Sequence, residues 1–268
     1  MIFPFTLKFH IHFIHPLPKY IPLFVDFWFE KAYIRSLNLK MIADNIKSLR
    51  DRIAEKCIKV NRNPGEIKII AVSKNFGINE ILETLNSDMH DFGENKAQEL
   101  DSKFAQLGNK VTWHFIGHLQ RNKVRYVVNC ADYIHSVDSL EIAAEINKRA
   151  EKLNKVQKIL LQVKTSDEET KSGLSDESEI IDIAHNCIEF KNMELTGLMT
   201  IAPFTKDQNL IRKSFKYLSN LKANLNSNGI FFNELSMGMT DDFEIAIEEG
   251  ATMLRIGTAI FGERDYSI

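Results

Sequence analysis

A closed (β/α)8 (TIM) barrel is the fold that the sequence predicts, and three observations favour it. The chain has 268 residues, which suits one barrel of this kind. From residue 41 onward, short runs of β-forming residues alternate with helical stretches, which is typical of βαβ units and a parallel sheet. Eight such runs are found, over 67–72, 89–92, 112–116, 133–137, 158–163, 195–200, 232–236 and 253–256. An open doubly wound sheet is the alternative, but no GxGxxG motif follows the first strand.

Helices are expected between these strands because apolar residues there recur at every third or fourth position. The clearest case is the first helix, whose apolar face consists of Ile42, Ile46, Leu49, Ile53 and Cys57. Asp138, with Glu141 three residues later, is predicted to cap the helix over 139–153. The remaining helices are predicted over 78–85, 94–107, 119–128, 177–188, 210–225 and 242–249.

The first 40 residues differ from the rest of the chain in composition. They contain 10 of the 26 aromatic residues and four of the six prolines. A membrane-spanning helix needs about 20 apolar residues in succession, and lysines, histidines and prolines interrupt every run here. We expect residues 1–40 to be an N-terminal extension that is disordered or outside the fold, with a membrane-touching tail as the alternative. Residues 41–268 are predicted to form one barrel domain.

Charge and cysteine content limit the class of protein. The chain has 34 basic and 36 acidic residues, and residues 41–268 alone carry a net charge of −5, so no basic excess favours nucleic acid. The three cysteines lie far apart and match neither a disulfide framework nor a zinc site. We therefore expect a cytoplasmic protein that acts without nucleic acid, membrane or metal.

Chemistry in such barrels takes place at the C-terminal ends of the strands. Lys74 ends the first predicted strand, and a lysine that is partly desolvated there can react with an aldehyde as a neutral amine. A lysine at a barrel rim is more often a solvated surface residue, so Lys74 alone is a weak indication. Arg255 lies inside the eighth predicted strand, where a charge needs either an ion-pair partner or a polar ligand.

Two turns that combine glycine with a hydroxyl follow strands seven and eight, where barrels often bind phosphate. One contains Gly238 and Thr240, and the other contains Gly257 and Thr258. Glycine lets the backbone approach an anion, and free N–H groups at a helix start bind it. A single turn of this kind is usually only a helix cap. Two of them, together with the lysine and the arginine, point to pyridoxal 5′-phosphate.

Residues 41–268 resemble the pyridoxal phosphate homeostasis proteins, which share the alanine-racemase-type barrel (fold type III of pyridoxal-phosphate proteins). No single motif carries the resemblance, but the motifs are specific in their combination and order. They are Ala71-Val72-Ser73-Lys74, Phe92-Gly93-Glu94-Asn95, the segment 113–120, Gly173-Leu174, Gly197-Leu198-Met199, and the segments 236–240 and 255–262.

The resemblance implies a role for each site residue. Lys74 would hold the cofactor as a Schiff base, Asn95 would lie beside the 3-oxygen of the ring, and Arg255 would face the ring nitrogen. The residues expected around the phosphate are Ser236, Gly238, Thr240, Gly257 and Thr258. Thr240 stands where the family usually has serine, so the hydroxyl is kept and the added branch changes only local packing.

Three polar residues near the strands are expected to be structural. His114 lies between Trp113 and Phe115 in a strand and is predicted to be a packed histidine rather than a base. Asp241 and Asp242 are predicted to cap the following helix.

The function implied by the resemblance is homeostasis of the cofactor with little or no catalysis, by a monomer whose candidate partners are apoenzymes that need pyridoxal phosphate. An arginine beside the ring nitrogen disfavours its protonation and makes the ring a poorer electron sink. An amino-acid racemase is the alternative. Racemisation needs a base on each face of the substrate, and the tyrosine-bearing second domain of alanine racemases is not expected here. A barrel enzyme that binds phosphorylated sugars through Lys74 is a third hypothesis.

Overall fold

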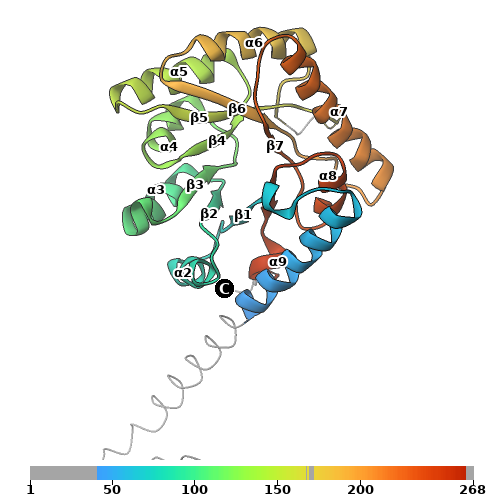
Figure 1. Cartoon of the computed structure of the whole chain (residues 1–268). Helices are drawn as coiled ribbons and strands as arrows, with labels where there is room; N and C mark the ends of the chain where they lie inside the picture. Colours follow the sequence, from blue (N-terminus) through green and yellow to red (C-terminus); the bar gives the residue numbers. More distant parts are fainter. Residues whose placement is uncertain (1–40, 167, 169–171, 264–268) are drawn as a thin grey trace, which may run out of the picture. The chain divides into compact units, whose positions relative to one another are not determined.

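The computed structural model describes residues 41–166, 168 and 172–263. Within this part of the chain, eight parallel strands pair in sequence order, and β8 pairs with β1 to close the barrel. Figure 1 shows these strands with the helices around them. The strands are β1 (Lys68–Val72), β2 (Asp91–Glu94), β3 (Thr112–Phe115), β4 (Tyr133–Val137), β5 (Gln157–Gln162), β6 (Met193–Met199), β7 (Glu234–Ser236) and β8 (Met253–Ile256). The predicted (β/α)8 barrel is therefore confirmed, and the open sheet is excluded.

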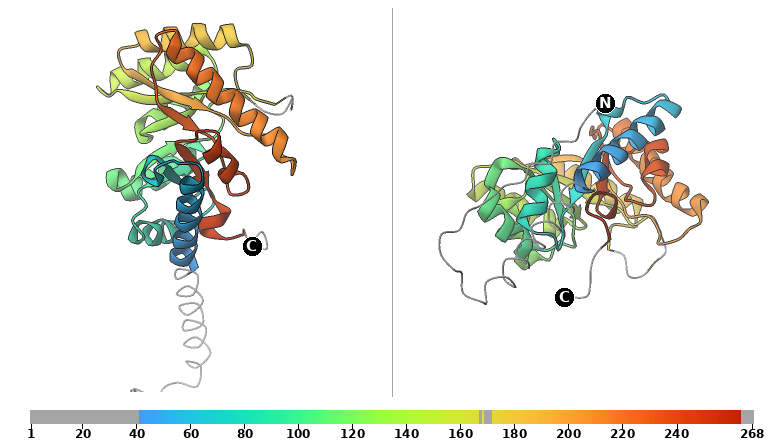
Figure 2. Two further views of the ribbon diagram at one scale, coloured as in Figure 1. Left: turned by 45° about the vertical axis from the view of Figure 1, so that its right-hand side comes forward. Right: turned by 90° about the horizontal axis from the view of Figure 1, so that it is seen from below.

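Helices follow the strands and cover the outside of the barrel, as the views of Figure 2 show. A helix over residues 41–59 precedes β1. The others are α2 (Ile78–Asn86), α3 (Ala97–Leu107), α4 (Val124–Cys130), α5 (Leu140–Lys152), α6 (Glu177–Glu189), α7 (Gln208–Ser227), α8 (Phe243–Glu248) and α9 (Thr258–Phe261). Short 3-10 turns lie over Pro64–Glu66, Gly108–Lys110 and Arg121–Lys123.

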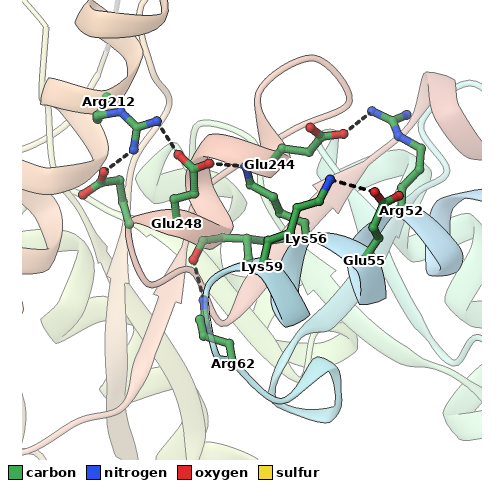
Figure 3. A network of polar contacts seen from close by, with 10 residues as sticks. Arg52, Glu55, Lys56, Lys59, Arg62, Arg212, Glu244 and Glu248 are labelled. Atoms are coloured by element: carbon green, nitrogen blue, oxygen red, sulfur yellow. Dashed lines mark hydrogen bonds and ion pairs between the residues drawn. The ribbon is translucent and has the colours of Figure 1, made fainter.

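The helix over residues 41–59 packs on the barrel by the apolar face that the sequence predicts. All five residues of that face are at most 3% exposed. Its polar side joins α7 and α8 through ion pairs (Figure 3). Arg52 lies 2.8 Å from Glu244, and Lys56 pairs with Glu248, which also binds Arg212 of α7. The Arg52–Glu244 pair is exposed and adds little stability, whereas the Lys56–Glu248 pair is partly buried. Burial of the apolar face is the main contribution that holds the helix in place.

The strands separate two apolar clusters because successive residues of a strand point to opposite faces. The larger cluster fills the space between the strands and the helices. The smaller cluster lies inside the barrel and consists of Ile70, Tyr133, Leu160, Met199 and Met253. His135 and Arg255 are two residues beyond Tyr133 and Met253 on the same strands, so they belong to the interior face.

Several element ends differ from the sequence prediction. Strand β2 runs two residues later than predicted, and β7 begins at Glu234 instead of residue 232. The N-cap of α5 differs from the prediction of Asp138: it is Ser139, whose hydroxyl accepts a hydrogen bond from the Ile142 N–H at 3.3 Å. Asp138 instead lies 3.6 Å from the Nδ1 atom of His118.

The extension predicted over residues 1–40 lies outside the described residues. In the described ranges, no helix is long and apolar enough to cross a bilayer.

Candidate functional site

A cavity of about 460 Å³ opens at the C-terminal ends of the strands. Residues from most strand ends meet in it, as the strand-end rule requires. Six of the eight predicted site residues line the cavity: Lys74, Asn95, Thr240, Arg255, Gly257 and Thr258. These six residues, predicted from the sequence, therefore lie around one cavity.

The other two predicted residues, Ser236 and Gly238, do not line the cavity. Ser236 is fully buried, and its hydroxyl contacts Arg255 and His135. Gly238 has a φ of +94°, and a Cβ there would lie 2.6 Å from the Cβ of Ala246. Its carbonyl accepts the backbone N–H of Arg255. Both residues therefore support the wall of the site from behind.

Lys74 follows β1 and is half-buried at the mouth of the barrel. The turn that carries it is held by Lys103, whose ammonium donates to the Ser73 carbonyl at 2.8 Å. The same ammonium lies 2.7 Å from Glu94 and 2.8 Å from Glu99. Glu99 also accepts the backbone N–H of Asn75 at 2.6 Å. The residues on both sides of Lys74 are thus tied to one buried cluster of charges.

This cluster was not identified from the sequence. Glu94 is fully buried, and burial raises the pKa of its carboxyl, although Lys103 and the Ser73 hydroxyl partly oppose that rise. Burial also acts to raise the pKa of Glu99, but the bonds from Lys103 and Asn75 outweigh it and lower the pKa. The sequence did contain one signal, the spacing of four residues between Glu99 and Lys103 on a helix.

Arg255 lies on the interior face of β8 and is 4% exposed. Its guanidinium donates to the Ser236 hydroxyl at 2.6 Å and to the Thr200 carbonyl at 2.8 Å. Burial lowers the pKa of Arg255 to about 10, so the group stays cationic at neutral pH. Among the described residues no carboxylate forms an ion pair with it. A buried cation of this kind favours an electronegative ligand atom in the cavity.

Asn95 follows β2, is half-buried and lines the same cavity. Its Oδ1 atom has no hydrogen-bond partner among the described residues. Buried polar atoms rarely stay unpaired, so the amide is suited to a polar atom of a ligand. Gly117 of the next strand end lies directly against this residue, because a Cβ on Gly117 would be 2.1 Å from the Asn95 carbonyl oxygen.

The turns after β7 and β8 form another part of the cavity wall. The Thr240 hydroxyl accepts the N–H of Ala259 at 3.3 Å, which links the two turns. A Cβ on Gly257 would meet only Val72, at 3.6 Å. Glycine therefore leaves open space at the cavity wall there and relieves no clash. The two hydroxyls and the open backbone are suited to a phosphate.

The residues expected to be structural have specific partners. His114 is buried, with Nε2 2.8 Å from the Asp91 carboxylate, as expected for a packed histidine. Asp242 occupies the N-cap position of α8, as predicted, but its carboxylate accepts the Met239 N–H at 2.6 Å and makes no side-chain cap bond to the helix. Asp241 lines the cavity instead.

Comparisons with known proteins identify the family of this chain. The family model described as alanine racemase, N-terminal domain, matches residues 37–265. The pyridoxal phosphate homeostasis protein of Aquifex aeolicus (strain VF5) is 39% identical over 225 residues, which cover 83% of this chain and 98% of that protein. This chain belongs to the pyridoxal phosphate homeostasis protein family. Its relative of the same name in Escherichia coli (strain K12) is 37% identical over 230 residues, 84% of this chain and 98% of that protein.

Solved structures place the family in its fold class. PipY of Synechococcus elongatus PCC7942 without PLP superposes with a TM-score of 0.75 at 34% identity, covering 82% of this chain and all of that one. The form of PipY with PLP bound gives 0.73 at the same identity. Alanine racemase of Clostridium difficile 630 in complex with cycloserine has a TM-score of 0.68 at 17% identity, over 86% of this chain and 60% of that chain. At that identity the likeness to the racemase concerns the fold alone.

Proposed function

We propose that this protein binds pyridoxal 5′-phosphate and acts in its homeostasis, with the cofactor attached to the Nζ atom of Lys74. The observation that carries the proposal is the content of a single cavity. It contains an amine at a strand end, a buried guanidinium with no carboxylate partner among the described residues, and a buried amide oxygen without a hydrogen bond. The amine suits the aldehyde of the cofactor, and the guanidinium suits the ring nitrogen. The Asn95 amide would meet the 3-oxygen through its NH2 group, because an amide oxygen only accepts.

Each group of residues in the cavity would bind a different part of the cofactor. Thr240, Gly257 and Thr258 would hold the phosphate, since they present hydroxyls and open backbone on one wall of the cavity. The lysine amine condenses with the aldehyde of the cofactor and releases one water. Arg255 would keep the ring nitrogen unprotonated, because a fixed cation disfavours a second positive charge beside it.

We propose that the protein does little or no catalysis. A ring nitrogen that stays unprotonated draws electrons weakly, which suits storage of the cofactor better than reactions of amino acids. The relatives are named for homeostasis and not for a catalysed reaction.

The proposal extends to the partners, the oligomeric state and the cellular compartment of the protein. Apoenzymes that require pyridoxal phosphate would receive the cofactor, and the barrel would act as a monomer. Cys57, Cys130 and Cys187 are free thiols buried in the outer core, which suits a reducing, cytoplasmic environment. Burial raises the pKa of Cys187 to about 12, so this thiol is unreactive.

A titration tests the proposal. Purified apoprotein mixed with pyridoxal 5′-phosphate should develop a visible absorption band distinct from that of the free cofactor, with one cofactor bound per chain. Pyridoxal without phosphate should bind more weakly, because it does not use the wall at Thr240 and Thr258. Absence of a band at any concentration would reject the proposal. Sustained conversion of an L-amino acid to its D-isomer by the loaded protein would favour a racemase instead.

Gly117→Ala tests the arrangement around Asn95. The added methyl would need to displace the Asn95 backbone, because it would lie 2.1 Å from the carbonyl oxygen. We expect pyridoxal 5′-phosphate to bind at least about tenfold more weakly and the fold to lose about 1–3 kcal/mol. Gly257→Ala is the stability control, since its methyl meets only Val72 at 3.6 Å. Equal affinity of Gly117→Ala and the wild type would contradict a binding role for this corner.

A further inference from the structure

A line of hydrogen bonds crosses the interior of the barrel and ends at Arg255. The Asp91 Oδ1 atom at the start of β2 lies 2.8 Å from Nε2 of His114. Nδ1 of His114 lies 2.9 Å from Nε2 of His135. Nδ1 of His135 lies 2.9 Å from the Ser236 hydroxyl, which accepts from the Arg255 guanidinium at 2.6 Å. Both histidines and the serine are fully buried.

The two ends of this line have fixed hydrogen-bonding roles. A guanidinium can only donate, so the Ser236 oxygen accepts from Arg255. Burial would raise the pKa of Asp91, but the bond from His114 and the nearby Lys68 outweigh it and lower the pKa, so the carboxylate is ionised and can only accept. His114 must therefore carry its proton on Nε2.

The roles of Asp91 and Arg255 then determine which group donates in each hydrogen bond between them. Burial lowers the pKa of His114, and burial together with the charge of Arg255 lowers that of His135, so both rings are neutral. A neutral imidazole has one donor and one acceptor nitrogen. With Nε2 of His114 protonated, its Nδ1 accepts from Nε2–H of His135. The Nδ1 atom of His135 is then free to accept the hydroxyl proton of Ser236.

The line therefore has one direction, in which each group donates toward Asp91. The Ser236 proton points away from the cavity, so its hydroxyl is not available as a donor to a phosphate. What remains for Ser236 is to accept from Arg255, while the Thr200 carbonyl accepts from the other terminal nitrogen of the guanidinium at 2.8 Å. Two acceptors on different strands fix the plane of the guanidinium.

We propose that Asp91, His114, His135 and Ser236 are positioning residues, which hold the Arg255 guanidinium toward the cofactor cavity from the opposite end of the barrel. The inference rests on the proposed binding of pyridoxal phosphate at that cavity. Asp91 begins β2 and Asn95 follows the end of that strand, so the two residues are about 13 Å apart at the usual rise of an extended chain. A carboxylate distant from the cofactor would thus set the orientation of the group that faces the ring nitrogen.

The first test needs no cofactor. In protein labelled with 15N-histidine, long-range proton–nitrogen spectra distinguish the two neutral ring forms from each other and from imidazolium. At neutral pH, His114 and His135 should both carry a proton on Nε2 alone. Asp91→Asn keeps an oxygen acceptor and should retain this pattern, whereas Asp91→Ala should lose it at His114. An Nδ1-protonated or charged ring in the wild type would overturn the proposal, whether or not the protein binds pyridoxal phosphate.

The second test measures affinity for pyridoxal 5′-phosphate in the full chain. Ser236→Ala removes one acceptor from Arg255, and we expect about fivefold to tenfold weaker binding, which is within the usual range for one lost hydrogen bond. If the serine acts only through the guanidinium, the same change should have no effect in protein that already carries Arg255→Met. An equal loss in both backgrounds would mean that Ser236 contacts the cofactor itself, which would overturn its role as a positioning residue. Failure of the wild type to bind would reject the proposed function, while the ring forms would still test the hydrogen-bond line.

Discussion

Lys103→Met is expected to lower the free energy of unfolding by about 3–5 kcal/mol at neutral pH, the largest stability effect that we expect in this protein. The methionine retains the volume of the side chain but removes the ammonium from Glu94, Glu99 and the Ser73 carbonyl. Glu94 is fully buried, so its carboxylate would lose its cation without gaining water. Chemical denaturation monitored by circular dichroism measures the change.

The loss in free energy of unfolding that we expect for Lys103→Met should depend on pH, and the direction of this dependence identifies Glu94 as its cause. The pKa of Glu94 is already raised by burial, and loss of Lys103 would raise it further. A carboxyl with a raised pKa destabilises the fold when it is ionised, so the penalty is complete above the folded-state pKa. It disappears as the pH falls below the unfolded-state pKa, near 4.3. The deficit of Lys103→Met should therefore shrink between pH 7 and pH 5.

Two variants control for other effects of this substitution. Glu94→Gln combined with Lys103→Met removes the stranded charge and should recover part of the lost stability. Lys47→Met disrupts an exposed pair with Asp51, also four residues apart on a helix, and should leave unfolding unchanged. A Lys103→Met protein as stable as the wild type would mean that the buried cluster does not hold the turn at Lys74.

Lys74→Ala is expected to abolish covalent attachment of pyridoxal phosphate, the largest functional effect. The phosphate wall and Arg255 would remain, so residual binding should be reversible and more than about tenfold weaker, a loss of at least about 1.4 kcal/mol. Treatment with borohydride followed by intact-mass measurement separates attached cofactor from bound cofactor. The alanine variant should gain no mass.

A second lysine in the same cavity provides the matched control. Lys164 also lines the cavity, after β5, but lies outside the predicted site. Lys164→Ala should retain the borohydride-stable adduct at the wild-type yield. Lys74→Arg keeps a positive charge at the strand end and should lose the adduct, since a guanidinium does not replace the amine in this reaction. An adduct that survives in Lys74→Ala and disappears in Lys164→Ala would reverse the assignment.

Much of the fold and the site could be predicted because each depends on local pattern. Alternating β-forming and helical runs predict the parallel barrel, and the strand-end rule then selects Lys74, Asn95 and Thr258 without knowledge of the packing. Errors of two residues at β2, and the cap placed on Asp138 instead of Ser139, concern element ends, where several polar residues compete for one role.

The remaining features depend on how distant elements meet. The pairing of Lys103 with Glu94 requires the rotation of α3 against β2, which no local pattern specifies. Ser236 was expected at the phosphate, yet the structure places it on the interior face of its strand, beside His135 and Arg255. Alternation of residues along the strands does assign His135 and Arg255 to the interior of the barrel. The contacts of Ser236 with these two residues depend in addition on the register of the closed barrel.

The most direct test of the central claim is the location of the cofactor on the chain. The loaded wild-type protein is reduced with borohydride, digested with a protease and analysed by mass spectrometry of its peptides. We expect one modified residue, Lys74, carrying a phosphopyridoxyl group at close to one per chain. Modification spread over surface lysines, or concentrated on any lysine other than Lys74, would contradict this expectation.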